Sequence, residues 1–262
     1  MVFEEREIGL SRGKVKYMKG GTGAPLLYFH SAGGMRVSAA LETLAATHTI
    51  YMPFAPGFDG TEPIAGISDC PDLAEFYGEF ADKVIGAQCD VLGHSFGGRI
   101  AIWFAATFPE KVRLLVLEAP SGFRPAGSAP MRTDPSALIA HPERATREKS
   151  PEAMAANGKA AHRYHKSLDN EERLIAQLGK IGAITLILHG TKDGMVPEEG
   201  ALFLKSRIRT SHLIYVYDAA HAIEVDQPEL FATVTGDFLT RGQGFLVNPG
   251  SDKVGAAAPA ID

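Results

Sequence analysis

Short apolar runs, each bounded by turn-forming residues, recur along the chain. A continuous apolar run of this length is typical of a strand buried on both faces of a parallel sheet. The predicted strands of this kind are 26–29, 48–52, 89–92, 112–117, 184–188 and 213–217. Residues 3–18 precede them and predict two short antiparallel strands, with Ser11-Arg12-Gly13 as the turn.

Between the strands, apolar residues three to four positions apart predict helices. The predicted helices are 37–47, 69–85, 100–108, 198–206 and a last one that Pro228 opens. Strands that alternate with helices indicate an α/β fold, with a mostly parallel central sheet that helices flank on both faces. In such a fold, ligands bind at the carboxyl ends of the strands.

One stretch departs from this alternation. Residues 120–180 are polar, rich in Ala and Pro, and contain no clear strand. Within them, Ser150-Pro151-Glu152 and Asn170-Glu171-Glu172 are typical helix starts. We expect a small helical cap at 120–180, inserted after the sixth strand into an α/β core formed by 1–119 and 181–242. Residues 243–262 carry no periodicity and are expected to form a mobile tail.

The stretch Gly93-His94-Ser95-Phe96-Gly97 lies where a predicted strand meets a predicted helix. A strand, a tight turn and a helix form the setting in which a nucleophilic serine is presented to substrate. The two glycines lack the Cβ atoms that would clash in such a turn. A Gly-x-Ser-x-Gly pattern alone often arises by chance, but these flanks favour Ser95 as a nucleophile.

A serine hydroxyl is a weak nucleophile until a base accepts its proton, so a histidine is required. Of the nine histidines, His221 follows the last predicted strand, in a loop at the same sheet edge as Ser95. We therefore predict that His221 is the base. His94 adjoins Ser95, but its side chain should point away from it. His162 and His165 lie on a predicted cap helix, where a solvated face is the simpler interpretation.

The base needs a carboxylate that holds its tautomer and stabilises the imidazolium. Asp193 lies in the loop that leaves the predicted strand 184–188, and the neighbouring Gly194 allows a sharp turn there. An Asp-Gly pair is also a common turn former. Glu118, at the end of the preceding strand, could reach the histidine as well. Chain order and loop context favour Asp193, and Glu118 stays open as the alternative.

The developing oxyanion needs two preset donors, and backbone N–H groups serve without reorganisation. The Phe96 N–H, directly after the nucleophile, is one predicted donor. The loop His30-Ser31-Ala32-Gly33-Gly34 supplies the other, for which Ala32 is the best candidate. The small residues of this loop permit close approach, so Ser31 and Gly33 are predicted to contact substrate.

Composition excludes several other classes of function. The chain has 262 residues and a formal net charge of -5, so it offers no basic field for nucleic acid or anionic lipid. No apolar run approaches the roughly 20 residues of a membrane span. Two cysteines make no disulfide scaffold, and the acidic start does not resemble a signal peptide, so a cytoplasmic location is expected. The histidines lack paired metal-ligand spacing, so we predict no metal site and no cofactor.

These motifs together resemble the α/β-hydrolase superfamily, in its single-chain branch of small serine esterases and carbon–carbon bond hydrolases. The matching stretches are His30–Gly34, Pro56-Gly57-Phe58, Gly93–Gly98, Gly190–Pro197, and Ala220-His221 with Gln227-Pro228-Glu229. They span about residues 14–240 in the family's order. Ser31 stands where the family more often has glycine, and the Asp usual near Phe54 is absent. A serine at 95 argues against the dehalogenase and epoxide hydrolase branches, which use aspartate.

The resemblance implies a small-molecule hydrolase with the catalytic residues Ser95, Asp193 and His221. We expect an acyl-enzyme mechanism on a small or medium ester, lactone or thioester beneath the cap. One alternative is cleavage of a carbon–carbon bond in a vinylogous diketone of the meta-cleavage type, which would need a polar ligand for the second carbonyl. Another is a slow-turnover ligand receptor. A homodimer stays open.

Three residues are candidates for that polar ligand. Arg163 and Tyr164 on the predicted cap are expected to bind substrate. Arg99, next to the elbow, is either such a ligand or a solvated helix charge.

Overall fold

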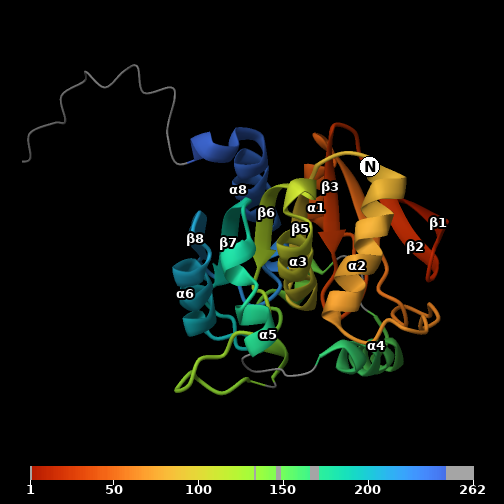
Figure 1. The fold of residues 1–262 in the computed structure, drawn as a ribbon. Helices are drawn as coiled ribbons and strands as arrows, with labels where there is room; N and C mark the ends of the chain where they lie inside the picture. The colour runs from red at the N-terminus through yellow and green to blue at the C-terminus, as the bar shows by residue number, and fades with distance from the viewer. Residues whose placement is uncertain (1, 133, 146–148, 166–170, 246–262) are drawn as a thin grey trace, which may run out of the picture.

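The computed structural model describes residues 2–132, 134–145, 149–165 and 171–245. A single eight-stranded sheet runs through the middle, in the order β1-β2-β4-β3-β5-β6-β7-β8 (Figure 1). Its strands are β1 Glu4–Leu10, β2 Gly13–Gly20, β3 Ala24–Phe29, β4 His48–Pro53, β5 Cys89–His94, β6 Val112–Glu118, β7 Ile184–Gly190 and β8 Ser211–Val216. Only the pairs β1–β2 and β2–β4 within it are antiparallel. The mostly parallel sheet is the one that the apolar runs predict.

Helices cover both faces of this sheet. They are α1 Ala39–Leu44, α2 Cys70–Phe80, α3 Phe96–Thr107, α4 Pro151–Tyr164, α5 Glu172–Ile175, α6 Glu198–Arg207, α7 Ile223–Asp226 and α8 Pro228–Arg241. The α2 and α3 helices pack together on one face, while α1 and α8 pack together on the other. Figure 1 shows α2 and α3 in front of the sheet, and α4 and α5 across its lower end.

Alternate residues of each central strand enter different cores. Leu27 and Phe29 of β3 join the core beneath α2 and α3, whereas Leu26 and Tyr28 join the core beneath α1 and α8. Side chains of a strand point to opposite faces in turn, so a strand covered on both faces must be apolar throughout. This explains why the predicted strands are continuous apolar runs.

Three predicted helices differ in extent from the observed ones. The 100–108 pattern belongs to α3, which begins at Phe96, directly after Ser95. The 37–47 pattern forms a helix only from residue 39, because the Ser38 hydroxyl accepts a hydrogen bond from the Leu41 N–H and caps the helix there. The 69–85 pattern forms α2 and then one wider helical turn, Ala81–Ile85, which ends at Gly86 with φ 67°. A left-handed residue at this position is a common helix end.

Residues 119–183, between β6 and β7, are called the cap segment below. It contains α4 and α5, and the Ser150 side chain caps α4 as predicted, by accepting from the Ala153 N–H. The predicted start at Asn170 and most of the predicted tail, residues 246–262, lie outside the described residues. None of the helices in the described ranges has the length and apolar character needed to cross a membrane.

Candidate active site

Ser95 joins β5 to α3 in a backbone conformation that few side chains adopt. Its φ is 55° and its ψ is −109°, and residues in such regions cost about 1–3 kcal/mol. The Ser95 N–H donates to the Glu118 carbonyl at 2.9 Å. A Cβ on Gly97 would lie 1.9 Å from the Phe29 carbonyl oxygen, and one on Gly93 would lie 2.3 Å from the Gly97 carbonyl oxygen. Both positions therefore require glycine, for the steric reason inferred from sequence.

Asp193 and His221 meet at the carboxyl edge of the sheet. The Asp193 Oδ2 lies 2.9 Å from the His221 Nδ1, and their side chains are 0% and 4% exposed. The other oxygen, Oδ1, accepts from the N–H groups of Met195 at 2.8 Å and Val196 at 3.0 Å. Burial alone would raise the pKa of Asp193, but His221 and the Val196 N–H outweigh it, so the pKa is lowered. These hydrogen bonds thus fix the orientation of the Asp193 carboxylate, with its Oδ2 directed at the His221 Nδ1.

The ring of His94 lies against His221. The His94 Nε2 is 3.1 Å from the His221 carbonyl oxygen, and the two ring centroids are 5.1 Å apart. A carbonyl can only accept, so Nε2 carries the hydrogen. Because His94 directly precedes Ser95, this contact places the His221 loop beside the elbow. The sequence carries no signal for such a role.

Glu118, the alternative acid, is occupied elsewhere. Its Oε1 accepts from the Glu224 N–H at 2.8 Å, and its side chain is fully buried. Burial, followed by the charge of Glu224, raises the pKa of Glu118 well above its usual range. The structure brings Asp193, and not Glu118, to the histidine.

We predict that Glu118→Gln keeps most of the activity and that its stability relative to the wild type increases as pH rises. A raised pKa means that the folded protein holds a proton that the unfolded chain has released, so wild-type stability falls as pH rises above the ordinary value of 4.5. Each unit of upward shift corresponds to about 1.4 kcal/mol. Gln mimics the protonated acid and does not titrate. Urea unfolding and ester hydrolysis at pH 5 to 9 check this, and a loss of activity like that of an Asp193 variant would contradict it.

His94, Glu118 and Glu224 also form the one group of metal-ligand side chains found among the described residues, each offering an atom within 4.8 Å of the others. The three residues lie far apart in sequence, so the spacing of the histidines gave no sign of this group. Glu224 already accepts from the Ser38 hydroxyl at 3.0 Å and the Tyr28 hydroxyl at 3.3 Å. Burial raises the pKa of Glu224 as well, although the Arg36 charge opposes this shift. Glu224 is thus already hydrogen-bonded to two hydroxyl groups and lies in the field of the Arg36 charge.

The loop that follows β3 carries the predicted second oxyanion donor. His30 shapes its start: the His30 Nε2 accepts from the Ala55 N–H at 3.0 Å, and Nδ1 donates to the Ser31 carbonyl at 2.8 Å. Over the described part of the chain, neither the Ala32 N–H nor the Phe96 N–H has a protein acceptor. Both are therefore available to a ligand.

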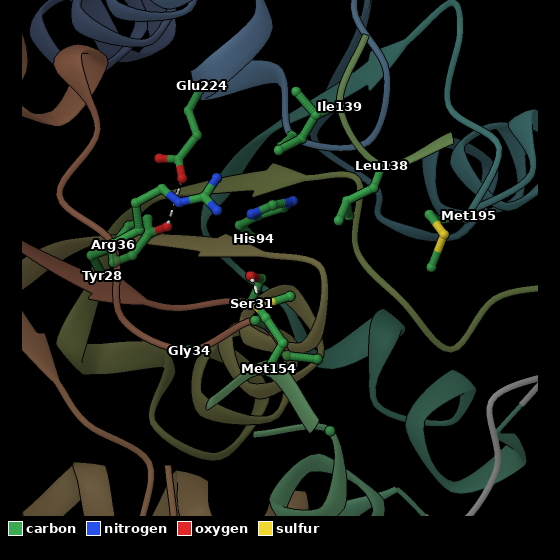
Figure 2. Close-up of a pocket in the computed structure, with 14 residues that line it drawn as sticks. Tyr28, Ser31, Gly34, Arg36, His94, Leu138, Ile139, Met154, Met195 and Glu224 are labelled. Carbon is green, nitrogen blue, oxygen red and sulfur yellow. Dashed lines mark hydrogen bonds between the residues drawn. The ribbon is translucent and has the colours of Figure 1, made fainter. Parts of the chain in front are cut away.

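A pocket of about 230 Å³ lies between this loop and the cap segment (Figure 2). Its core side includes the predicted residues Ser31, Ala32 and Gly33. Figure 2 shows polar groups at one end and apolar groups at the other. The polar end has Tyr28, Arg36 and Glu224, His94 lies in the middle, and Leu138, Ile139 and Met195 form the apolar end.

The cap residues that line the pocket differ from those expected. Tyr164 is buried and donates its hydroxyl to the Pro56 carbonyl at 2.7 Å, so it braces the core instead of facing the pocket. Arg163 is exposed and lies over Gly57. Leu138, Ile139, Met154 and Gly158 take their place. Helical periodicity in the cap was too weak to indicate which face turns inward.

Arg99 is neither a solvated helix charge nor a pocket residue. It is fully buried, and its Nη1 lies 3.0 Å from the Glu171 Oε2 in the cap segment. The expectation of a solvated charge was wrong because the cap segment covers this turn of α3. The buried ion pair fixes the cap segment to the helix that follows Ser95.

Known proteins agree with this architecture. A family described as "Alpha/beta hydrolase family" matches residues 21–234. The pimeloyl-(acyl-carrier protein) methyl ester esterase of Neisseria meningitidis is 27% identical over 250 residues, covering 82% of this chain and 79% of that protein. The 2-hydroxymuconate semialdehyde hydrolase of a Pseudomonas species is 26% identical over 268 residues, covering 87% and 91%.

Solved structures show the same fold. A meta-cleavage product hydrolase from Pseudomonas fluorescens superposes with a TM-score of 0.74 at 18% identity, covering 90% of this chain and 97% of that chain. The match of fold and family extends over most of the sequence, as the resemblance of its motifs implied. The chain belongs to the alpha/beta hydrolase family.

Proposed function

We propose that this protein is a serine hydrolase that cleaves a small or medium carboxylic ester, lactone or thioester through an acyl-enzyme. The observation that carries the proposal is the 2.9 Å contact of the buried Asp193 with His221, in a loop that His94 ties to the strained Ser95 elbow. The named relatives hydrolyse esters or carbon–carbon bonds, which supports the class but not a substrate.

In the proposed mechanism, the Ser95 Oγ attacks the substrate carbonyl while His221 accepts the hydroxyl proton. Asp193 stabilises the resulting imidazolium and fixes its orientation. The Ala32 and Phe96 N–H groups bind the oxyanion, and each such donor is worth about 3–4 kcal/mol of the barrier. The C–O or C–S bond breaks, and His221 returns the proton to the leaving group. Water then attacks the acyl-enzyme with His221 again as base, releasing the acid and Ser95.

The pocket predicts a preference for short acyl chains. Its volume of about 230 Å³ is below the roughly 300 Å³ at which ligand pockets usually begin. We expect kcat/KM to be higher for p-nitrophenyl acetate and butyrate than for the octanoate, measured by p-nitrophenolate release. Ser95→Ala is the control for non-enzymatic hydrolysis. If wild type and control were equally inert on all three esters, the esterase proposal would fall.

Carbon–carbon bond cleavage is the second candidate, and the polar end of the pocket favours it. Arg36 and Tyr28 line the end of the pocket opposite Leu138 and Ile139, where they would face the second carbonyl of a vinylogous diketone. Loss of the dienolate absorbance of such a compound, with Ser95→Ala as control, tests this candidate. Turnover far below about 1 per second on every ester and diketone, with tight binding of one ligand, would favour the receptor alternative.

A further inference from the structure

A single cap residue reaches across to the loop that carries Ala32. Asn157 of α4 is 1% exposed. Its Nδ2 donates to the Gly33 carbonyl at 2.8 Å and to the Asp59 Oδ1 at 2.9 Å, and its Oδ1 accepts from the Asp59 N–H at 2.8 Å. The side-chain amide therefore uses both its NH₂ group and its oxygen for hydrogen bonds to the core. A helix residue that faced solvent would need no such protein partners.

Asp59 extends this contact to the far end of the same loop. Its Oδ2 accepts from the Met35 N–H at 2.6 Å, and Lys149 of the cap segment pairs with Oδ1. Burial opposes ionisation of Asp59, but the hydrogen bonds from Lys149, Asn157 and Met35 outweigh it and lower the pKa. Asp59 itself adopts φ 51°, a conformation that only surrounding contacts maintain.

Gly34 fits between these groups without spare room. Its φ is 86°, and a Cβ there would lie 2.3 Å from the Asn157 Nδ2 and 2.5 Å from the Asp59 Oδ2. The loop is thus held by the cap segment at Gly33, enclosed at Gly34 and held by Asp59 at Met35. Its first half has a separate anchor in His30, described above.

We propose that Asn157 is a positioning residue that sets the Ala32 N–H in the oxyanion hole, so that cap docking and oxyanion stabilisation are coupled. The inference rests on the proposed function. The Gly33 carbonyl shares its peptide unit with the Gly34 N–H, which donates to the Ser31 carbonyl at 2.9 Å. That carbonyl shares its peptide unit with the Ala32 N–H, so a shift of the Gly33 carbonyl is passed through this turn to the donor. Oxyanion donors act only when they are preset at the position of the developing charge. Without Asn157, the loop keeps His30 and the indirect link from Lys149 through Asp59 to Met35, but it loses its direct hydrogen bond to the cap segment at Gly33.

A residue that merely anchors the cap would give a different kinetic result. Loss of an anchor opens the pocket and weakens ground-state binding, so KM rises. Loss of donor positioning leaves ester binding largely intact but weakens transition-state binding, so kcat falls. Comparison of the change in kcat with the change in KM therefore separates a positioning residue from a residue that only anchors the cap.

The experiment compares Asn157→Asp and Asn157→Ala with the control Lys159→Ala, which changes an exposed side chain of the same helix. Asn157→Asp keeps the size of the side chain but loses both donated hydrogen bonds, and it carries the test alone should Asn157→Ala not fold. Three quantities are measured: kcat and KM for p-nitrophenyl butyrate, the inhibition constant of a trifluoromethyl ketone, and the rate of Ser95 labelling by a fluorophosphonate. Thermal melting confirms folding.

We expect Asn157→Asp to lower kcat by about 10- to 100-fold, the range for a reacting group misplaced by an ångström, with KM nearly unchanged. The ketone, which binds as a tetrahedral adduct, should weaken by a similar factor, and labelling should slow. Lys159→Ala should match wild type. An unchanged kcat, or a rise in KM alone, would overturn the inference. Failure of the fluorophosphonate to label wild type would instead overturn the proposed function.

Discussion

Replacement of Ser95 by alanine is expected to lower ester hydrolysis by about 10⁶-fold in kcat, the scale found for the nucleophile of other serine hydrolases. The elbow holds Ser95 at φ 55° with 8% exposure, and alanine at this position removes the hydroxyl that would form the acyl-enzyme. Steady-state release of p-nitrophenolate and loss of fluorophosphonate labelling are the two measurements.

Ser121 provides a matched control for this variant. Its N–H donates to the Ser95 carbonyl at 3.1 Å, while its buried hydroxyl has no partner in the part of the chain that the structure describes. Ser121→Ala removes a serine hydroxyl next to the elbow without touching the proposed nucleophile. We expect it to stay active. Full activity of Ser95→Ala would show that the elbow does not supply the nucleophile.

Asp193→Asn is expected to lower kcat by about 10⁴-fold, because an amide at this position favours the wrong tautomer of the catalytic histidine. The carboxylate accepts from the His221 ring and from two backbone N–H groups, so Asn would present a donor where only acceptors fit. Pre-steady-state acylation with p-nitrophenyl acetate measures the loss directly.

Low pH should remove the stabilising contribution of the Asp193 carboxylate in the wild-type protein. Because the pKa of Asp193 is lowered in the folded protein, its ionised carboxylate stabilises the fold above the ordinary aspartate pKa near 3.9. That contribution is lost as pH falls through the pKa of the folded state.

Glu118→Gln is the matched carboxyl-to-amide control for Asp193→Asn, on the neighbouring strand. If Glu118→Gln lost as much activity as Asp193→Asn, the identity of the triad acid would have to be revised.

Much of the fold could be predicted because its signals are local. A strand covered on both faces must be largely apolar, and the middle parts of β3, β5, β6 and β7 are. The elbow pattern is also short in sequence, and Gly93 is required by its contact with Gly97. Gly97 itself is required by its approach to Phe29 of the neighbouring strand β3. Helix ends were less accurate, because side-chain caps such as that of Ser38 decide them.

The candidate site could be predicted only in part. Ser95, Asp193 and His221 each follow a strand, and parallel strands deliver their carboxyl ends to one edge. The cap residues could not be assigned in this way. Arg99 lies near Ser95 in sequence and Tyr164 lies on a cap helix, yet both are buried by packing of the cap segment on the core. The division into core and cap at the predicted bounds stays a prediction.

The sequence by itself determined the order of strands and helices and the sharp turn at Ser95, and it supplied a short list of acids and bases that could serve a nucleophile there. Three contacts were decided only by the tertiary structure. Asp193 contacts His221, Glu118 accepts a hydrogen bond from the Glu224 N–H, and Asn157 donates to Gly33 in the loop of Ala32. Secondary structure depends on residues within a few positions of one another, so periodicity reveals it. The partners in these three contacts lie 28 to 124 positions apart, and only the packing of complete elements brings them within hydrogen-bonding distance.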